Sequence, residues 1–100
     1  MAHLKVDLQE GFDGDKVLVR AGGREVYQKD GVRTRYQIGY ADGFEVELPD
    51  GTTSVEVELP ERGLAASKQV NLSPVTHLAV NLTRDGRLEV TEEAEGFRYA

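Results

Sequence analysis

The sequence predicts an all-β fold, a single antiparallel β-sandwich of seven or eight short strands. Three observations lead to this fold class. Five Asp-Gly pairs and one Gly-Gly pair divide the 100 residues, and such pairs favour tight turns because glycine adopts a positive φ without steric cost. Apolar and polar residues alternate between these pairs, as expected for strands with one buried face. The turns recur at roughly the spacing of eight to twelve residues that is typical of sandwiches.

The length and composition limit the class of protein. Residues 1–100 suit a single domain, large enough to bury a core without metal ions or disulfides. The absence of cysteine removes both a disulfide framework and a cysteine zinc site. No apolar run is long enough to span a bilayer, and residues 1–6 lack the basic and then apolar pattern of a secretion signal. We expect a cytoplasmic protein, with a removed signal peptide as the open alternative.

Acidic side chains outnumber basic ones, and the formal net charge is −6. The excess lies in residues 42–100, which hold twelve acidic and five basic side chains, whereas residues 1–41 hold six and seven. Binding to nucleic acid or to an anionic membrane requires a basic surface, so we expect neither of these partners. An unknown protein with a basic surface is the partner that the charge favours.

The first expected strand covers residues 4–8, where leucine and valine alternate with charged residues. A loop at residues 9–15 follows, and strands at 16–21 and 24–28 then form a hairpin around Gly22-Gly23. This two-residue loop predicts three cross-strand pairs of matching character: Val19 with Val26, Leu18 with Tyr27, and Arg20 with Glu25. After a turn at Asp30-Gly31, the same alternation predicts a strand at residues 32–38 with Ile38 on its buried face.

Residues 44–48 and 54–59 form the clearest expected hairpin, with its turn at Asp50-Gly51. Only a loop with an even number of residues keeps the apolar residues of both strands on one face, so Val46 is expected opposite Val55. The same register sets Glu45 opposite Glu56 on the outer face, a like-charge pair that costs stability.

The last expected strands lie at residues 64–72 and 75–83 and in a hairpin that ends at Val90. Lys68 falls on the inward parity of the first of these, which is typical of an edge strand protected against pairing. This edge could pair with a second copy, so we expect a monomer or a weak homodimer. The final hairpin needs an odd loop, because only a three-residue loop with Gly86 in the left-handed region sets Leu82 opposite Leu88. The acidic residues 91–96 are expected to be mobile.

One stretch resembles a known group of sandwiches: Phe44-x-Val46-x-Leu48-Pro49-Asp50-Gly51-x-x-x-Val55-x-Val57-x-x-Pro60-x-x-Gly63. It is similar to the central hairpin of the prealbumin-like domains, which include the Cna protein B-type repeats and the carboxypeptidase regulatory-like domains. In those families an apolar strand enters a Leu-Pro-x-Gly turn, and an alternating strand follows. The resemblance implies a non-enzymatic module, such as a spacer, a folding accessory, or a protein- or carbohydrate-binding domain. An immunoglobulin-like strand arrangement is the open alternative.

The residues needed for catalysis are sparse. Nucleophilic catalysis requires a nucleophile, a base and an orienting group in one place, and His3 and His77 are the only imidazoles. His3 lies near the start of the chain, and His77 falls on the outward parity of its strand. The three acids of residues 10–15 are expected to stabilise a solvated turn rather than to bind calcium. We therefore expect a protein that is not an enzyme and that has no cofactor or metal site.

Two binding surfaces remain as hypotheses. The first is an acidic face of the hairpin at residues 44–59, which would attract a basic protein; it consists of Glu45, Glu47, Glu56 and Glu58. The alternative is a carbohydrate-binding module, in which flat rings stack on sugar faces. Tyr27 and Tyr40 are its candidate residues, because each lies beside an expected turn.

Overall fold

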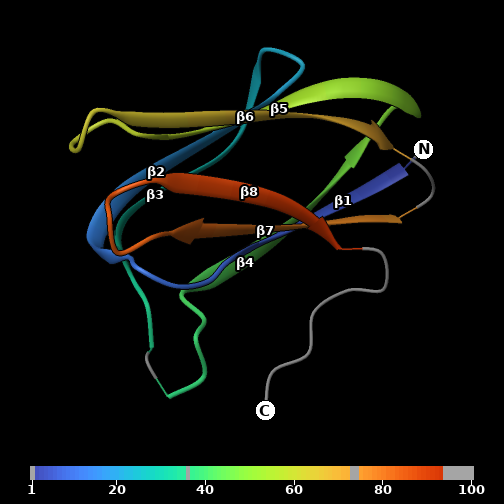
Figure 1. Cartoon of the computed structure of the whole chain (residues 1–100). Helices are drawn as coiled ribbons and strands as arrows, with labels where there is room; N and C mark the ends of the chain where they lie inside the picture. The colour runs from blue at the N-terminus through green and yellow to red at the C-terminus, as the bar shows by residue number, and fades with distance from the viewer. Residues whose placement is uncertain (1, 36, 73–74, 94–100) are drawn as a thin grey trace.

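The computed structural model describes residues 2–35, 37–72 and 75–93, which fold into two four-stranded sheets packed face to face (Figure 1). The predicted all-β sandwich is therefore confirmed, with eight strands. They are β1 (Ala2–Leu8), β2 (Asp13–Ala21), β3 (Arg24–Arg33), β4 (Asp42–Leu48), β5 (Gly51–Leu59), β6 (Leu64–Leu72), β7 (Val75–Leu82) and β8 (Leu88–Glu93). Within these residues no helix is long and apolar enough to cross a membrane.

The strand order places the first strand in the middle of a sheet. Sheet A has the order β4-β1-β7-β8, and sheet B has the order β3-β2-β5-β6. All neighbouring strands run antiparallel except β1 and β7, which are parallel. The expectation of a purely antiparallel sandwich is wrong at this pair. A parallel pair requires a long crossover connection, and here five strands lie between its two members in the sequence.

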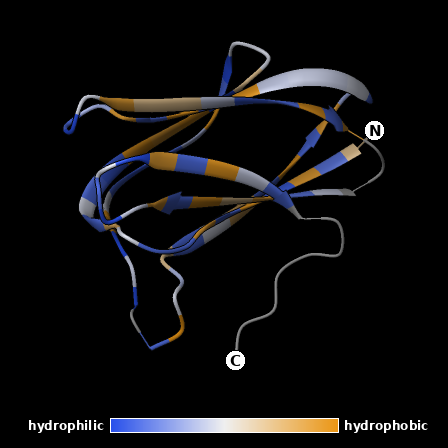
Figure 2. Ribbon diagram, in the orientation of Figure 1, coloured by the Kyte–Doolittle hydropathy of each residue, from blue (hydrophilic) through white to orange (hydrophobic). Residues whose placement is uncertain are grey.

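The core forms from the inward residues of both sheets. Leu4, Val6 and Leu8 of β1 are fully buried, as the alternation predicts. Phe12, from the loop between β1 and β2, is the largest fully buried side chain. Figure 2 shows the alternation directly, since hydrophobic and hydrophilic bands follow one another along the strands. Burial of these apolar faces is the main force that holds the two sheets together.

The expected hairpin of residues 44–48 and 54–59 does not form. β4 belongs to sheet A, where Val46 lies opposite Leu4; β5 belongs to sheet B, between β2 and β6. The Pro49-Asp50 connection crosses from one sheet to the other, so the predicted pairing of Glu45 with Glu56 is wrong. Alternation reports which residues point inward but not which sheet a strand joins. Both arrangements bury the same residues.

The Asp30-Gly31 pair lies within β3 and does not form a turn. Asp30 and Gly31 together oppose Lys16 of β2, because Val17 pairs with Lys29 and Asp15 with Val32. This is a β-bulge, and Gly31 adopts a φ of 68° in it. The expected strand at residues 32–38 is therefore wrong: its first residues continue β3, whereas Ile38 lies in the following loop and is 43% exposed.

The first hairpin is partly as predicted. Gly22 and Gly23 form its turn, and Arg20 pairs with Glu25. Beyond this pair a bulge shifts the register, so that Val19 lies opposite Tyr27 and not opposite Val26. The predicted pair of Leu18 with Tyr27 is wrong for the same reason, since Leu18 lies opposite Gln28. The side chain of Tyr27 thereby joins the inward face of sheet B.

The last hairpin and the edge strand are confirmed. Leu82 pairs with Leu88, the N–H of Gly86 donates to the carbonyl oxygen of Thr83, and Gly86 has a φ of 84°. β6 is an edge of sheet B. Of the segment 91–96 that we expected to be mobile, residues 91–93 belong to β8 and residues 94–96 lie outside the described residues.

Candidate interaction surfaces

The four glutamates of the predicted acidic face occupy two separate sheets. Glu45 and Glu47 lie on β4, with side chains that are 58% and 61% exposed. His3 of β1 lies between them, with Nδ1 at 3.1 Å from a carboxylate oxygen of Glu45 and Nε2 at 3.8 Å from one of Glu47. His3, which lies on the neighbouring strand of sheet A, thus contacts both glutamates.

Glu56 and Glu58 lie on the outer face of sheet B and are half-buried. Arg20 of β2 donates to Glu58 across a distance of 2.5 Å. Among the described residues, Glu56 has no ion-pair partner within 4 Å. Of these two carboxylates, only that of Glu58 is therefore paired with a cation.

A shallow hollow of about 240 Å³ lies beside these two carboxylates. Its other lining residues are Ala65, Ala66 and Ser67 of the edge strand β6. Ser67 lies opposite Glu56, and Ala65 lies opposite Glu58. The hollow exists because the β6 side chains are too short to cover the surface next to the glutamates.

Tyr27 joins the two sheets on the opposite side of the sandwich. Its ring stacks on that of Phe44, with centroids 4.4 Å apart and planes at 9°. Its hydroxyl donates to a carboxylate oxygen of Asp42 at 2.6 Å, which also accepts from Lys29 at 3.1 Å. Burial, and then the neighbouring Asp42 carboxylate, raise the pKa of the Tyr27 hydroxyl. Since Phe44 covers one face of the ring, the geometry does not favour Tyr27 as a platform for a sugar.

Two substitutions test this bridging role. We expect Tyr27→Phe to keep the stack and to lose about 1 kcal/mol of unfolding free energy with the hydrogen bond. Tyr27→Ala also removes the ring and should cost about 3 kcal/mol. Urea denaturation measures both. A Tyr27→Ala variant as stable as the parent protein would contradict the bridge.

Tyr40 lies in the loop before β4, close to Asp7. A Cβ atom added to Gly43 would be 2.5 Å from the Tyr40 hydroxyl and 2.6 Å from a carboxylate oxygen of Asp7, so both groups pack over this glycine. Burial, and then the charges of Asp7 and Asp42, raise the pKa of Tyr40. Asp7 is 4% exposed, although its parity predicted an exposed side chain. The charge of Asp42 thus contributes to the raised pKa of both Tyr27 and Tyr40.

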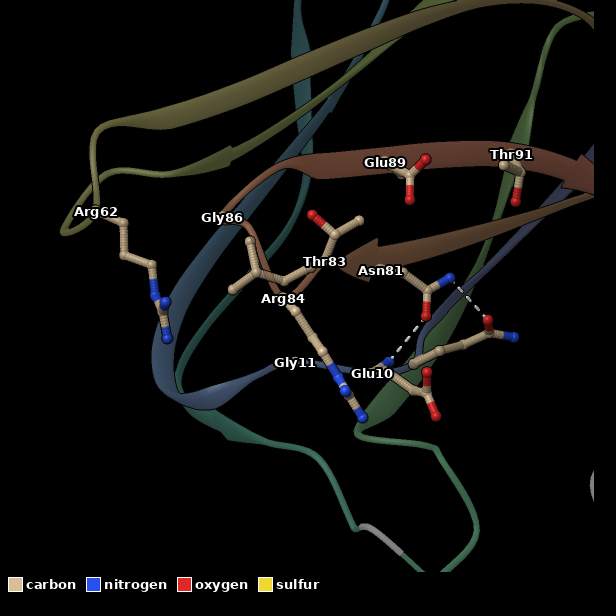
Figure 3. A pocket seen from close by; sticks show the side chains of 11 residues that line it. Glu10, Gly11, Arg62, Asn81, Thr83, Arg84, Gly86, Glu89 and Thr91 are labelled. Atoms are coloured by element: carbon tan, nitrogen blue, oxygen red, sulfur yellow. Dashed lines mark hydrogen bonds between the residues drawn. The ribbon is translucent and has the colours of Figure 1, made fainter.

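A larger polar groove of about 770 Å³ lies at one end of the sandwich (Figure 3). The loop between β1 and β2 meets the turn between β7 and β8 there. Asn81 fixes this junction: its side-chain oxygen accepts from the N–H of Glu10 at 3.0 Å, and its amide nitrogen donates to Gln9 at 2.9 Å. Arg84 extends past Gly11 toward Glu10 in Figure 3. The groove is lined by acidic and basic side chains and by no aromatic one. This lining does not favour a particular class of ligand.

At the same end of the molecule, the buried carboxylate of Asp15 pairs with Arg62. It accepts from Nε of Arg62 at 2.6 Å and from its Nη2 at 3.1 Å, and its side chain is 7% exposed. Burial would raise the pKa of Asp15, but the hydrogen bonds from Arg62 and from the N–H of Asp13 outweigh burial and lower it. We expected a solvated turn here. Arg62 lies 47 residues away in the sequence, and no local pattern predicts the pair.

The two histidines, His3 and His77, lie on the neighbouring strands β1 and β7 of sheet A. His77 lies opposite Lys5 across the parallel pair of β1 and β7, and His3 lies among the glutamates of β4. In the described part of the chain, no group of three or more histidine, aspartate or glutamate side chains could hold a metal ion.

The fold and these surfaces define the chain as a small eight-stranded β-sandwich with polar and acidic surface sites. Comparisons with known proteins give no relative: no family model, curated protein or solved structure matches it.

Proposed function

We propose that this protein is a non-catalytic interaction domain that binds a basic partner on the outer face of sheet B, at Glu56 and Glu58. One observation carries the proposal: these two carboxylates border a hollow at the open edge of their sheet. The half of the predicted acidic face on β4 is the weaker candidate, because His3 lies against both of its carboxylates. Opposite charge steers encounter and favours one class of partner.

The two packed four-stranded sheets are compatible with the resemblance of residues 44–63 to the prealbumin-like sandwiches. Such domains are largely spacers, folding accessories and binding modules, a range that includes the function proposed for this chain. We further infer that no nucleic acid and no membrane is a partner, because the formal net charge is −6 and residues 42–100 hold twelve acidic and only five basic side chains.

Binding of two short peptides tests the proposal. We expect an octapeptide of alternating lysine and serine to bind, and one of alternating glutamate and serine not to bind. The charge reversal Glu56→Lys should weaken binding of the basic peptide about tenfold, through loss of one attraction and gain of one repulsion. Isothermal titration calorimetry at low and high salt measures the affinity, which should fall with salt.

Glu47→Lys is the matched control, since it makes the same charge change on sheet A. It should leave the affinity within twofold of the parent value. Equal losses in the two variants would show that the peptide responds only to net charge and would overturn the proposed site. Binding of the acidic peptide would do the same.

A further inference from the structure

β6 is the longest uninterrupted edge of the sandwich. It runs for nine residues, Leu64–Leu72, and pairs on one side only, with β5. The backbone groups on its other side are those that a further strand would bind. Addition of a partner strand to such an edge is an established way in which a sheet recognises an extended peptide.

The other three edges carry bulges or exposed charges, whereas the one charge of β6 is the inward Lys68, opposite Val55. β3 contains bulges that interrupt its pairing register, and β4 presents the exposed Glu45 and Glu47. β8 has six residues, among them the exposed Glu89 and Glu92. Charges and bulges are the usual features that protect an edge. The outer face of β6 has none of them, because its exposed residues are uncharged: Ala65, Ser67, Gln69 and Asn71.

The inward side of this edge leaves apolar surface for an added strand to cover. β6 lies beside β8 of the other sheet (Figure 1). Leu64 of β6 and Leu88 and Val90 of β8 pack on the core but stay half-exposed. No hydrogen bond or ion pair joins β6 to β8 among the described residues. The opposite side of the sandwich is closed by the stack of Tyr27 on Phe44.

The outward side selects for basic side chains. An added strand would lie about 4.8 Å from β6, and its outward side chains would stand beside Ala65 and Ser67. These short residues leave open the hollow that leads to Glu56 and Glu58. A lysine or arginine side chain is long enough to cross the hollow. The inward Lys68 disfavours an added strand with only apolar side chains. A partner strand that contains both apolar and polar side chains is therefore favoured.

We infer that β6 is a docking strand: an extended segment of a protein partner, with alternating basic and apolar side chains, adds to sheet B as a fifth strand. The basic side chains reach Glu56 and Glu58, and the apolar ones cover the opening between β6 and β8. This inference rests on the proposed function, and it names the way in which the basic partner binds.

Backbone methylation separates strand addition from simple charge attraction. The probe is an octapeptide of alternating lysine and valine, made in two further forms with N-methyl groups on alternate residues. In one form the methyl groups replace the N–H groups that face β6, and in the other they replace those that face away. We expect one form to lose binding at least tenfold and the other to keep it within threefold. Amide exchange of β6, followed by NMR, should slow on addition of the unmethylated peptide.

The outcomes distinguish the two proposals. If the peptide binds, Glu56→Lys weakens it, and both methylated forms bind equally, strand addition is overturned and the basic-partner site stands. If the peptide does not bind, or Glu56→Lys has no effect, the proposed function is overturned. Sedimentation without peptide tests a second copy as the occupant. A dimer with protected β6 amides would overturn the assignment of this edge to a partner.

Discussion

Replacing Gly11 with alanine is expected to lower the free energy of unfolding by about 4 kcal/mol, because backbone strain and steric overlap act together. Gly11 has a φ of 94°, a region that strains any residue with a Cβ atom. The new Cβ would lie 2.7 Å from the Cβ of Leu82 and closer still to the Leu82 carbonyl oxygen. The N–H of Leu82 donates to the carbonyl oxygen of Glu10 at 2.8 Å, so the two backbones cannot separate without losing this bond.

Gly23→Ala is the control, because it shares the backbone strain without the collision. Gly23 has a φ of 80°, and nothing lies within 4 Å of its added Cβ. The expected loss is about 1 kcal/mol. Urea denaturation of both variants measures the difference, which isolates the cost of overlap with Leu82. Equal losses in the two variants would contradict the close approach at Gly11.

Arg62→Ala is expected to lower the free energy of unfolding by about 2 to 3 kcal/mol, because it leaves the Asp15 carboxylate buried without its cation. The value lies at the low end for buried ion pairs, since the Arg62 side chain is 39% exposed. Arg87→Ala is the matched control. The side chains of Arg87 and Asp85 are 80% and 66% exposed. Loss of this ion pair should therefore lower the free energy of unfolding by about 0.5 kcal/mol or less. Similar losses would contradict the importance of burial at Asp15.

The pH dependence of stability gives this pair a second readout. The pKa of Asp15 in the folded protein lies below its ordinary value of 3.8. Folding therefore favours the ionised carboxylate, and its contribution is present above about pH 4 and lost as the pH falls through the lowered pKa. In Arg62→Ala, the two hydrogen bonds from Arg62 no longer oppose the effect of burial on Asp15, and only that from the N–H of Asp13 remains. The stability difference between parent and variant should therefore shrink below pH 4, and a constant difference would contradict the assignment.

The sequence predicts the faces of the strands better than it predicts their partners. Alternation locates the buried leucines and valine of β1, although not the buried Asp7, and loop parity predicts the final hairpin with Gly86, because both depend on neighbouring residues alone. The hairpin of residues 44–59 fails because a corner between two sheets satisfies the same parity as a turn within one. Asp30-Gly31 fails because a bulge and a turn both require a glycine with positive φ.

The candidate site could be predicted only in part, for a similar reason. Glu56 is recognisable as an outward acid on an alternating strand. The hollow beside it depends on Ala65 and Ser67, which only the pairing of β5 with β6 brings next to it. The pair of Asp15 with Arg62 and the stack of Tyr27 on Phe44 likewise join residues from different strands. Their residue types are ordinary in the sequence, so no local signal distinguishes them.

The place of β1 between β4 and β7 has a consequence for the order in which the chain folds. Sheet B consists of segments within residues 13–72, so all of its strands exist before β7 has been synthesised. Sheet A cannot close until Val75–Leu82 emerges and pairs with the strand that was made first. Contacts between such distant parts of a chain slow folding. During synthesis, β1 therefore has only β4 as a neighbour in its sheet until β7 emerges. The apolar side chains of β1 become fully buried only after that step.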